Sequence, residues 1–299
     1  MAIVNAASGT AAKHEADETR KTLAAAFQEH GLNAEITMVS GAGIEASALR
    51  ARERAQNGEI DAIAVGGGDG TIRTVSQILA GTKVPLAVLP LGTLNHFAKD
   101  IGIPLELAAA VAVIAGWSVQ SIDLGEVNGE SFINNSSIGL YPSMVADRER
   151  RREAHGMAKW TAMVLALLRA LRRFPRHRLI LDADDVAIAR QTPCLFVGNN
   201  EYDMSFLSAG RIQLDAGRLF LYVAKPRTAL AFLWFAVKAG LGFPVRERDM
   251  DLIEAREATI RGRARHVLVA LDGEVRKMSM PLNYRIRPGA LRVIVPAAA

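Results

Sequence analysis

Residues 64–72 read AVGGGDGTI, an apolar run that passes into a glycine-rich segment. The run 61–65 predicts a buried strand, and 71–80 predicts the helix that follows it. Four of the five residues from Gly66 to Gly70 are glycine, whereas an ordinary strand–helix turn needs only one. Glycines here allow positive φ and close backbone approach, so exposed N–H groups can face a phosphate. The stretch therefore predicts a phosphate-binding loop at the end of a buried strand.

Two polar residues of this loop extend the prediction. Thr71 is placed to cap the following helix, and Asp69 is placed to hold a magnesium ion shared with the phosphates. The loop is not a dinucleotide fingerprint, because the third glycine of G-x-G-x-x-G would fall on Thr71. No Gly-Lys-Ser/Thr and no protein-kinase signature occurs in the chain. The sequence thus excludes the commonest nucleotide folds and keeps a phosphate site.

Strand-like and helix-like segments alternate over the first 120 residues. The strand-like segments are 2–5, 34–39, 61–65 and 86–89, and the helix-like segments are 13–30, 44–57, 71–80 and 104–115, the last with proline in its first turn. This alternation predicts βα units around a parallel sheet, that is, an α/β nucleotide-binding domain.

Two further loops leave strands at the same expected edge of this sheet. They are 5–9 and 90–95, and both combine small residues with hydroxyl or amide groups. Taken singly, either is better explained as a plain turn. Because ligands of open α/β sheets bind beyond the carboxyl ends of the strands, three such loops together predict one shared ligand.

The pattern changes after about residue 123. Short β-like runs occur at 132–134, 178–181, 186–189, 195–197, 219–223, 258–260, 267–270 and 292–295, and long helical patterns occur near 147–174 and 227–242. We therefore predict a nucleotide-binding domain over 1–122 and a β-rich domain from 123.

Composition restricts the function further. The 299 residues carry a net charge of +5, with 9 basic against 12 acidic residues in 1–122 and 27 against 19 in 123–299. The single cysteine, Cys194, excludes an internal disulfide framework. No signal-peptide pattern and no apolar run long enough to span a membrane is present, so we expect a cytoplasmic protein. The basic second half predicts an anionic partner.

Two segments of the second half suit a membrane surface. Residues 147–178 hold ten basic residues around an apolar stripe of Trp160, Met163, Val164, Leu167, Leu168 and Leu171. Residues 228–243 are aromatic-rich and too short to span a bilayer. The alternatives are a core helix with snorkelling arginines for the first segment, and burial in the core for the second.

Several motifs together resemble the diacylglycerol kinase catalytic family, which includes soluble bacterial lipid kinases and more distant sphingosine and ceramide kinases. They are VNAASG (4–9), VGGGDGTI (65–72), PLGTLNHFAKDIGIP (90–104), INNSSIGLY (133–141), LDAGRLFLYVAK (214–225) and LDGE (271–274). The GGDGT loop is shared with NAD kinases and phosphofructokinases, whereas GTLN and LDGE are more specific. The resemblance covers essentially the whole chain.

The resemblance implies transfer of the γ-phosphoryl group of ATP, with Mg2+, to a lipid hydroxyl. It implies an α/β domain of the NAD kinase and phosphofructokinase type, a sandwich-like β domain over 123–283, and a nucleotide in the cleft between them. It also implies that residues from about 284 to 299 return to the first domain. Matching positions give as nucleotide-binding residues Asn5, Ala6, Ala7, Ser8, Gly9, Ser40, Gly66, Gly67, Gly68, Asp69, Gly70, Thr71, Thr93 and Asn95.

A carboxylate must accept the proton of the lipid hydroxyl. Asp272 and Glu274 are alternate residues, so in a strand they would share a face, with Gly273 allowing close approach. We expect Glu274 to be the base, with Asp272 as the alternative. Without the resemblance, a hairpin turn with solvated acids explains the same residues.

The resemblance also implies metal ligands at Asp69, Asp123 and Asp215. Two departures from the family pattern affect them. His96 replaces an aspartate of the acidic network around magnesium, and Ala216 replaces the aspartate that supplies a structural metal ligand in bacterial members. Metal affinity or substrate preference is therefore open.

The leading hypothesis is a peripheral lipid kinase whose partner is a lipid substrate at a membrane surface. An NAD kinase is the alternative enzyme, and a nucleotide- or lipid-binding protein without catalysis is the alternative of another class. We expect no nucleic-acid partner, since no recognised motif accompanies the basic charge. A homodimer is one of the open oligomeric states.

Overall fold

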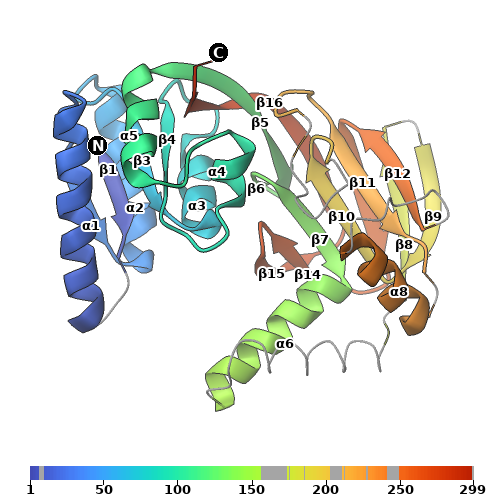
Figure 1. The fold of residues 1–299 in the computed structure, drawn as a ribbon. Helices are drawn as coiled ribbons and strands as arrows, with labels where there is room; N and C mark the ends of the chain where they lie inside the picture. The colour runs from blue at the N-terminus through green and yellow to red at the C-terminus, as the bar shows by residue number, and fades with distance from the viewer. Residues whose placement is uncertain are drawn as a thin grey trace. The chain divides into compact units, whose positions relative to one another are not determined.

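The computed structural model describes residues 1–6, 10–155, 174, 176–184, 186–202, 211, 213–226, 228–240 and 249–297. The chain divides into two compact units, Met1–Leu124 with Pro288–Ala299, and Gly125–Arg287. The divisions fall inside two strands, β5 (Ser118–Val127) and β16 (Leu282–Val295), so each unit receives part of both (Figure 1).

A parallel sheet forms the centre of the first unit, as predicted. Its strands are β1 (Ala2–Asn5), β2 (Ile36–Val39), β3 (Ile63–Gly67) and β4 (Leu86–Pro90), in the order β2-β1-β3-β4, followed by the end of β16. Ile3 lies opposite Val65 in parallel register, and Val293 of β16 lies opposite Leu86. β3 and β4 are buried along their whole length, as expected for inner strands of a parallel sheet covered by helices, which explains their nearly continuous apolar runs.

The helices of this unit connect successive strands (Figure 1). They are α1 (Thr10–Glu29), α2 (Ile44–Gln56), α3 (Asp69–Leu79), α4 (His96–Asp100) and α5 (Leu107–Gly116), with a 3-10 turn at Gly41–Gly43. Leu23 and Phe27 are buried four positions apart on α1. One predicted start was wrong: α5 begins after Pro104, because the carboxylate of Glu106 accepts hydrogen bonds from the N–H groups of Ala108 and Ala109.

Two antiparallel layers build the second unit. One sheet has the order β12-β11-β10-β7-β14-β15, and the other layer joins β16-β13-β8-β9 with β5 and β6. The bounds are β6 (Glu130–Phe132), β7 (Asn135–Gly139), β8 (His177–Ala183), β9 (Val186–Thr192), β10 (Cys194–Asn199), β11 (Leu219–Ala224), β12 (Met250–Ala255), β13 (Glu257–Gly262), β14 (His266–Leu271) and β15 (Glu274–Ser279). The predicted β-rich second half is confirmed.

One hydrophobic core lies between these layers. It combines Leu195, Leu221 and Val269 from the six-stranded sheet with Leu181 and Ile260 from the other layer. Packing of two inner faces in this way is the arrangement of a β-sandwich.

Tyr284 is fully buried in the same core, and its hydroxyl lies 2.9 Å from that of Ser136. Burial raises the pKa of Tyr284, so this phenol stays neutral. The pair therefore satisfies two polar groups that would otherwise be buried without partners.

In the described part of the second unit, the sandwich is accompanied by α6 (Leu140–His155) and α8 (Ala229–Gly240). Within the described residues, no helix is long and apolar enough to cross a membrane. The predicted apolar stripe between Trp160 and Leu171 lies outside the described residues.

Candidate functional site

The strand order of the first unit reverses between β1 and β3. Such a reversal is the place where open α/β sheets have their ligand crevice, beyond the carboxyl ends of the strands. The loops that follow β1, β2, β3 and β4 all start at this edge, because the four strands are parallel. The structure therefore brings together the loops at Asn5, Ser40, 66–71 and 90–95.

A hydrogen bond ties two of these loops together. The amide nitrogen Nδ2 of Asn5 donates to the hydroxyl Oγ1 of Thr71 over 2.9 Å. The expected capping role of Thr71 was wrong: α3 begins at Asp69 with Gly68 as its cap residue, and Thr71 lies in the first turn. Its hydroxyl is used instead to hold the end of β1 against α3.

The loop after β2 lies against the same asparagine. The N–H of Ala6 donates to the carbonyl oxygen of Val39 over 2.7 Å. A Cβ at Gly41 would lie 3.9 Å from Oδ1 of Asn5. Ser40 is exposed, and its hydroxyl makes no capping hydrogen bond, so it is available at this edge. Ala7, Ser8 and Gly9 lie outside the described residues.

The glycines allow two loops to approach each other closely. A Cβ at Gly92 would lie 2.5 Å from the Cα of Gly68, and one at Gly67 would lie 2.8 Å from the Cβ of Thr71. Gly66, Gly67, Gly68 and Gly70 all lack the positive φ that the sequence suggested. Close packing of backbone, rather than left-handed conformation, therefore requires glycine here.

Asp69 connects α3 to α4. Its Oδ1 accepts from the N–H of Phe97 over 3.1 Å, and its Oδ2 accepts from the N–H of His96 over 3.4 Å. The carboxylate thus satisfies the first N–H groups of a short helix that contains the exposed side chain of His96. Sequence periodicity missed this contact, because a helix of five residues is too short to show a repeat.

Asn95 shapes the loop after β4. It has a left-handed φ of 50°, and its buried side chain accepts from the N–H of Gly92 and donates to the carbonyl oxygens of Pro90 and Gly92. These contacts close the loop on itself. Thr93 lies at the turn of the loop with an exposed side chain. Asn95 therefore fixes the conformation of the loop, and the loop exposes the side chain of Thr93 to solvent.

The predicted metal ligands lie in different surroundings. Asp123 is buried, and its Oδ1 accepts from the N–H of Gly289 over 2.8 Å, whereas Asp215 is exposed. Across the described ranges, no three His, Cys, Asp or Glu side chains are grouped so that they could hold a metal ion. Each oxygen of Asp69 accepts a single N–H, which leaves lone pairs for a cation. The Asp69 carboxylate fits the usual mode of Mg2+ binding, in which one or two protein carboxylates are combined with nucleotide phosphates.

Asp272 lies in the second unit and is held by backbone groups. Asp272 and Gly273 form the two-residue turn between β14 and β15, with φ of 47° and 89°. The carboxylate of Asp272 accepts from the N–H groups of Ile133, Asn134 and Asn135 at 2.8, 2.7 and 3.1 Å. The carboxylate of Asp272 therefore holds the segment between β6 and β7 against the turn between β14 and β15.

Glu274 begins β15 immediately after this turn. The expected shared strand face with Asp272 was wrong, because Asp272 has left-handed backbone and lies outside the strand. Glu274 is exposed, with Oε2 3.5 Å from Nη2 of Arg276. Of the two predicted acids, Glu274 is thus the one that solvent reaches freely.

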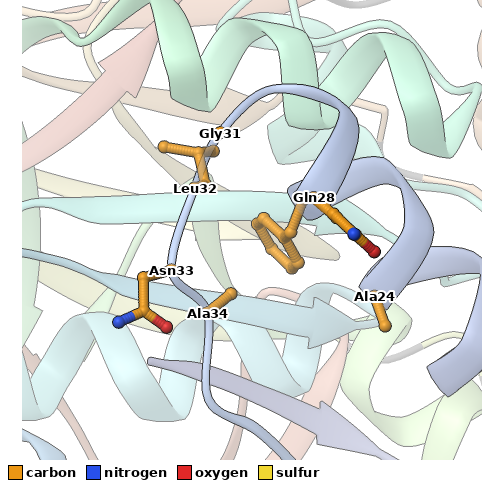
Figure 2. A pocket seen from close by; sticks show the side chains of 7 residues that line it. Ala24, Gln28, Gly31, Leu32, Asn33 and Ala34 are labelled. Atoms are coloured by element: carbon orange, nitrogen blue, oxygen red, sulfur yellow. The ribbon is translucent and has the colours of Figure 1, made fainter.

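A separate hollow of about 410 Å3 lies at the turn between α1 and β2 (Figure 2). Ala24 and Gln28 line it from the helix, and Gly31, Leu32 and Asn33 line it from the turn. This turn precedes β2, so the hollow is at the amino end of that strand, opposite the crevice. It is not the candidate site.

Comparisons with known proteins agree with this geometry. Residues 1–127 match the family model of the diacylglycerol kinase catalytic domain, and residues 142–295 match that of the YegS C-terminal NAD kinase beta sandwich-like domain. The second match agrees with the sandwich of the second unit.

The names of similar curated proteins correspond to these two family models. A "Diacylglycerol kinase" of Mycobacterium tuberculosis is 31% identical over 245 residues, which cover 79% of this chain and 77% of that protein. A "Probable lipid kinase YegS-like" of Pseudomonas aeruginosa is 30% identical over 298 residues, which cover 96% and 93%.

A crystal structure of a diacylglycerol kinase from Bacillus anthracis has the same fold, with a TM-score of 0.68 at 22% identity. The match covers 99% of this chain and 96% of that one. The chain belongs to the family of diacylglycerol kinases and YegS-like lipid kinases.

Proposed function

We propose that the protein transfers the γ-phosphoryl group of ATP, in the presence of Mg2+, to a hydroxyl of diacylglycerol or a related lipid. The observation that carries this proposal is the crevice edge of the first unit, where the Asn5–Thr71 hydrogen bond holds the glycine-rich loop at the start of α3. The choice of a lipid acceptor is supported by the names of the relatives.

The nucleotide phosphates belong, in this proposal, at the start of α3. The first N–H groups of a helix lack partners within it and carry partial positive charge, which favours an anion. Gly67 and Gly68 present backbone without side chains there, and the exposed hydroxyls of Ser40 and Thr93 supply further donors at the same edge. Ala7, Ser8 and Gly9 complete the proposed set from the sequence.

Asp69 is the proposed protein ligand of the magnesium ion. When bound, Mg2+ supplies neutralisation of the charge on the phosphates. Asp123 and Asp215 remain further proposed ligands. Asp69 would keep its two backbone hydrogen bonds in this role, so that the start of α4 stays fixed while the carboxylate faces the phosphates.

Glu274 is the proposed base that accepts the proton of the lipid hydroxyl. Phosphoryl transfer depends mainly on positioning and charge, and one carboxylate within hydrogen-bond reach of the hydroxyl completes the requirement. Asp272 already accepts three backbone N–H groups, which favours a positioning role for it. We propose that the enzyme reaches its acceptor as a peripheral protein at a membrane surface.

The test is transfer of label from [γ-32P]ATP with Mg2+ to lipids in mixed micelles. Diacylglycerol, monoacylglycerol, phosphatidylglycerol, sphingosine and ceramide are the acceptors, and Glu274→Gln is the blank. We expect label in one lipid and a loss of at least about a hundredfold in the variant. Absence of label from every lipid, while ATP still binds, would contradict the proposal.

An NAD kinase is the second candidate, because the family model of the second unit describes an NAD kinase-like sandwich. NAD is therefore added as a soluble acceptor in the same assay. Label in NAD rather than in lipid would replace the first proposal with this one.

A further inference from the structure

A basic pocket lies in the second unit, apart from the predicted acids. It measures about 550 Å3 and is lined by the start of β8, the connection from β13 to β14, and the first turn of α6. Its titratable lining residues are Arg176, His177, Arg178, Arg263 and His266. Among the described residues that line it, none is acidic. The pocket therefore attracts anions.

The arginines of this pocket differ from several arginines that are ion-paired in the same unit. Those pairs include Arg190 with Asp251, Arg218 with Glu254, and Arg261 with Asp182. Arg176, Arg178 and Arg263 are exposed and form no ion pair with any residue in the described part of the chain. Three guanidinium groups are thus free to bind an anion in one place, and guanidinium matches phosphate geometry especially well.

One wall of the pocket also holds a polar atom that needs a partner. Nε2 of His177 is buried and has no hydrogen-bond partner. Burial lowers the pKa of His177, so its imidazole stays neutral near neutral pH and Nε2 is either a donor or an acceptor. Buried polar atoms normally have partners, so Nε2 of His177 is an exception, and because it is buried it adds no exposed group to the pocket.

An exposed apolar stripe runs along α8. Leu230, Trp234 and Val237 follow each other at positions i, i+4 and i+7, with 77%, 63% and 42% of their surface exposed. Phe232 lies on the opposite side of the helix and packs against a cluster that includes Leu140. The stripe therefore faces away from the body of the unit, which excludes its burial in the core.

The pocket and the stripe belong to the same end of the unit. The ring of Phe174 lies 5.8 Å from that of Phe232 on α8, and Arg176 follows Phe174 by two residues. The first turn of α6 contributes Ser143 to the pocket and Met144 to the cluster beneath α8. Figure 1 shows α8 beside the start of α6, where β7 ends.

We propose that this end of the second unit docks on an anionic phospholipid bilayer. The stripe of α8 lies in the membrane interface, where tryptophan and leucine are favoured, and a headgroup phosphate enters the basic pocket. Arginine side chains close to an exposed apolar stripe are the combination that binds an anionic lipid surface. The inference rests on the proposed lipid kinase function only in its choice of a bilayer as the partner.

The test measures binding of the full chain to vesicles without nucleotide or diacylglycerol. Vesicles of phosphatidylcholine alone are compared with an equimolar mixture of phosphatidylcholine and phosphatidylglycerol by co-sedimentation. Each arginine near an anionic surface accounts for about a fivefold change in binding, so the variant R176Q/R178Q/R263Q should bind the mixed vesicles about a hundredfold less tightly. Its binding to neutral vesicles should change much less, because the choline cation offsets the phosphate charge of phosphatidylcholine and no net surface charge attracts the arginines.

The matched control is Arg218→Gln. It removes one positive charge from the same unit, as R263Q does, but Arg218 is ion-paired and lies near Asp184, at the opposite end of β8 from Arg178. R218Q should bind both vesicles like the wild type. If the triple variant fails to fold, R263Q alone should still show about a fivefold loss. Equal binding of wild type and R263Q to the mixed vesicles would overturn the proposal.

The stripe is tested by L230Q/W234Q, with Leu105→Gln as the control for an exposed leucine elsewhere. The double variant should lose binding to both kinds of vesicle by at least about tenfold, since interfacial binding scales with the apolar area buried. Brominated phosphatidylcholine should quench part of the tryptophan fluorescence of the wild type, and L230Q/W234Q should lose that quenched part. Unchanged binding of the double variant, or binding of inorganic phosphate without any binding of vesicles, would overturn the proposal. Because no acceptor lipid or ATP is present, a failure of phosphorylation leaves this result intact.

Discussion

Asn5 and Thr71 are 66 positions apart in the chain and are joined by a hydrogen bond of 2.9 Å. The bond links the end of β1 to the first turn of α3, across the point where the strand order reverses. It fixes the two loops that the proposed function needs next to each other. The consequence is that one hydroxyl supports both local stability and the shape of the phosphate site.

Thr71→Val tests this role, because valine keeps the shape and removes the hydroxyl. The variant should lose about 1 kcal/mol of unfolding free energy, since the Asn5 amide is left without its acceptor. ATP affinity should fall by about fivefold or more, as the loop loses its fixed position. Denaturant unfolding and titration calorimetry measure the two effects.

Thr22→Val is the matched control for that variant. The hydroxyl of Thr22 also donates a hydrogen bond, to the carbonyl oxygen of Glu18, but on the exposed side of α1. It should leave ATP affinity unchanged. An N5A/T71V double-mutant cycle with a coupling energy near zero would show that the bond contributes nothing.

Gly92→Ala tests the close approach of the two loops. An alanine Cβ would lie 2.5 Å from the backbone Cα of Gly68 and 2.7 Å from Oδ1 of Asn95, and backbone cannot swing aside as a flexible side chain can. We expect a loss of about 1–3 kcal/mol of unfolding free energy, together with loss of ATP binding. Thermal unfolding and calorimetry report both.

Gly116→Ala is the contrasting glycine variant. Nothing lies within 4 Å of a Cβ at Gly116, which ends α5. Alanine there should leave stability unchanged or raise it by up to about 1 kcal/mol. Similar losses for the two variants would mean that the close approach of Gly92 and Gly68 is not what requires glycine.

The α/β half could be predicted because β1, β3 and β4 are short, buried and apolar, and because a helix follows each of the four parallel strands. The β-rich half was predicted as a class but not completely: β5, β7, β12 and β15 were missed. β12 reads MDLIEA and β5 reads SVQSIDLGEV, so polar residues interrupt the apolar pattern of both. β12 pairs with β11 and β5 pairs with β16, which lie far along the chain, and local periodicity does not contain such pairings.

The site could be predicted only in part, for the same reason. The glycine-rich loop is local, so its place at the end of β3 followed from the sequence. The partners of Asp272 lie 137 to 139 positions away, and those of Asp69 lie 27 and 28 positions away, so neither set could be derived from spacing. The dipeptide Asp272-Gly273 is a typical hairpin turn sequence. It predicts the backbone at Asp272 better than the assumption that Asp272 and Glu274 alternate along one strand.

Replacing Asp272 should mainly lower the stability of the protein, whereas replacing Glu274 should mainly lower its activity. Asp272→Ala leaves three backbone N–H groups without their acceptor, so it should cost about 2–4 kcal/mol of unfolding free energy. Glu274→Gln changes an exposed side chain and should leave stability within about 0.5 kcal/mol. If Glu274 is the base, kcat should fall at least about a hundredfold.

Arg276→Gln is the control for the loss of the neighbouring charge, since Arg276 is the ion-pair partner of Glu274. It should lower kcat much less than Glu274→Gln does. Full activity of Glu274→Gln, with inactivity of a folded Asp272→Asn, would assign the base to Asp272 instead.

Cys194 provides a measure of how stability depends on pH. It is the single cysteine of the chain and is 2% exposed, and desolvation raises the pKa of its thiol from 9.0 to about 12. The folded state therefore holds this proton more tightly than the unfolded state does. The resulting stability is fully present below pH 9 and is lost as the pH rises toward 12.

The measurement compares wild type with Cys194→Ala in denaturant at a series of pH values. The difference in unfolding free energy between them should decrease by about 1.4 kcal/mol per pH unit above pH 9, because only the unfolded wild type releases the thiol proton there. Native Cys194 should also react with a thiol reagent at pH 8 far more slowly than the unfolded chain, since the thiolate is the reactive form and the side chain is buried. Parallel stability curves for the two proteins, or rapid labelling of the native chain, would show that Cys194 is accessible to water in the folded protein.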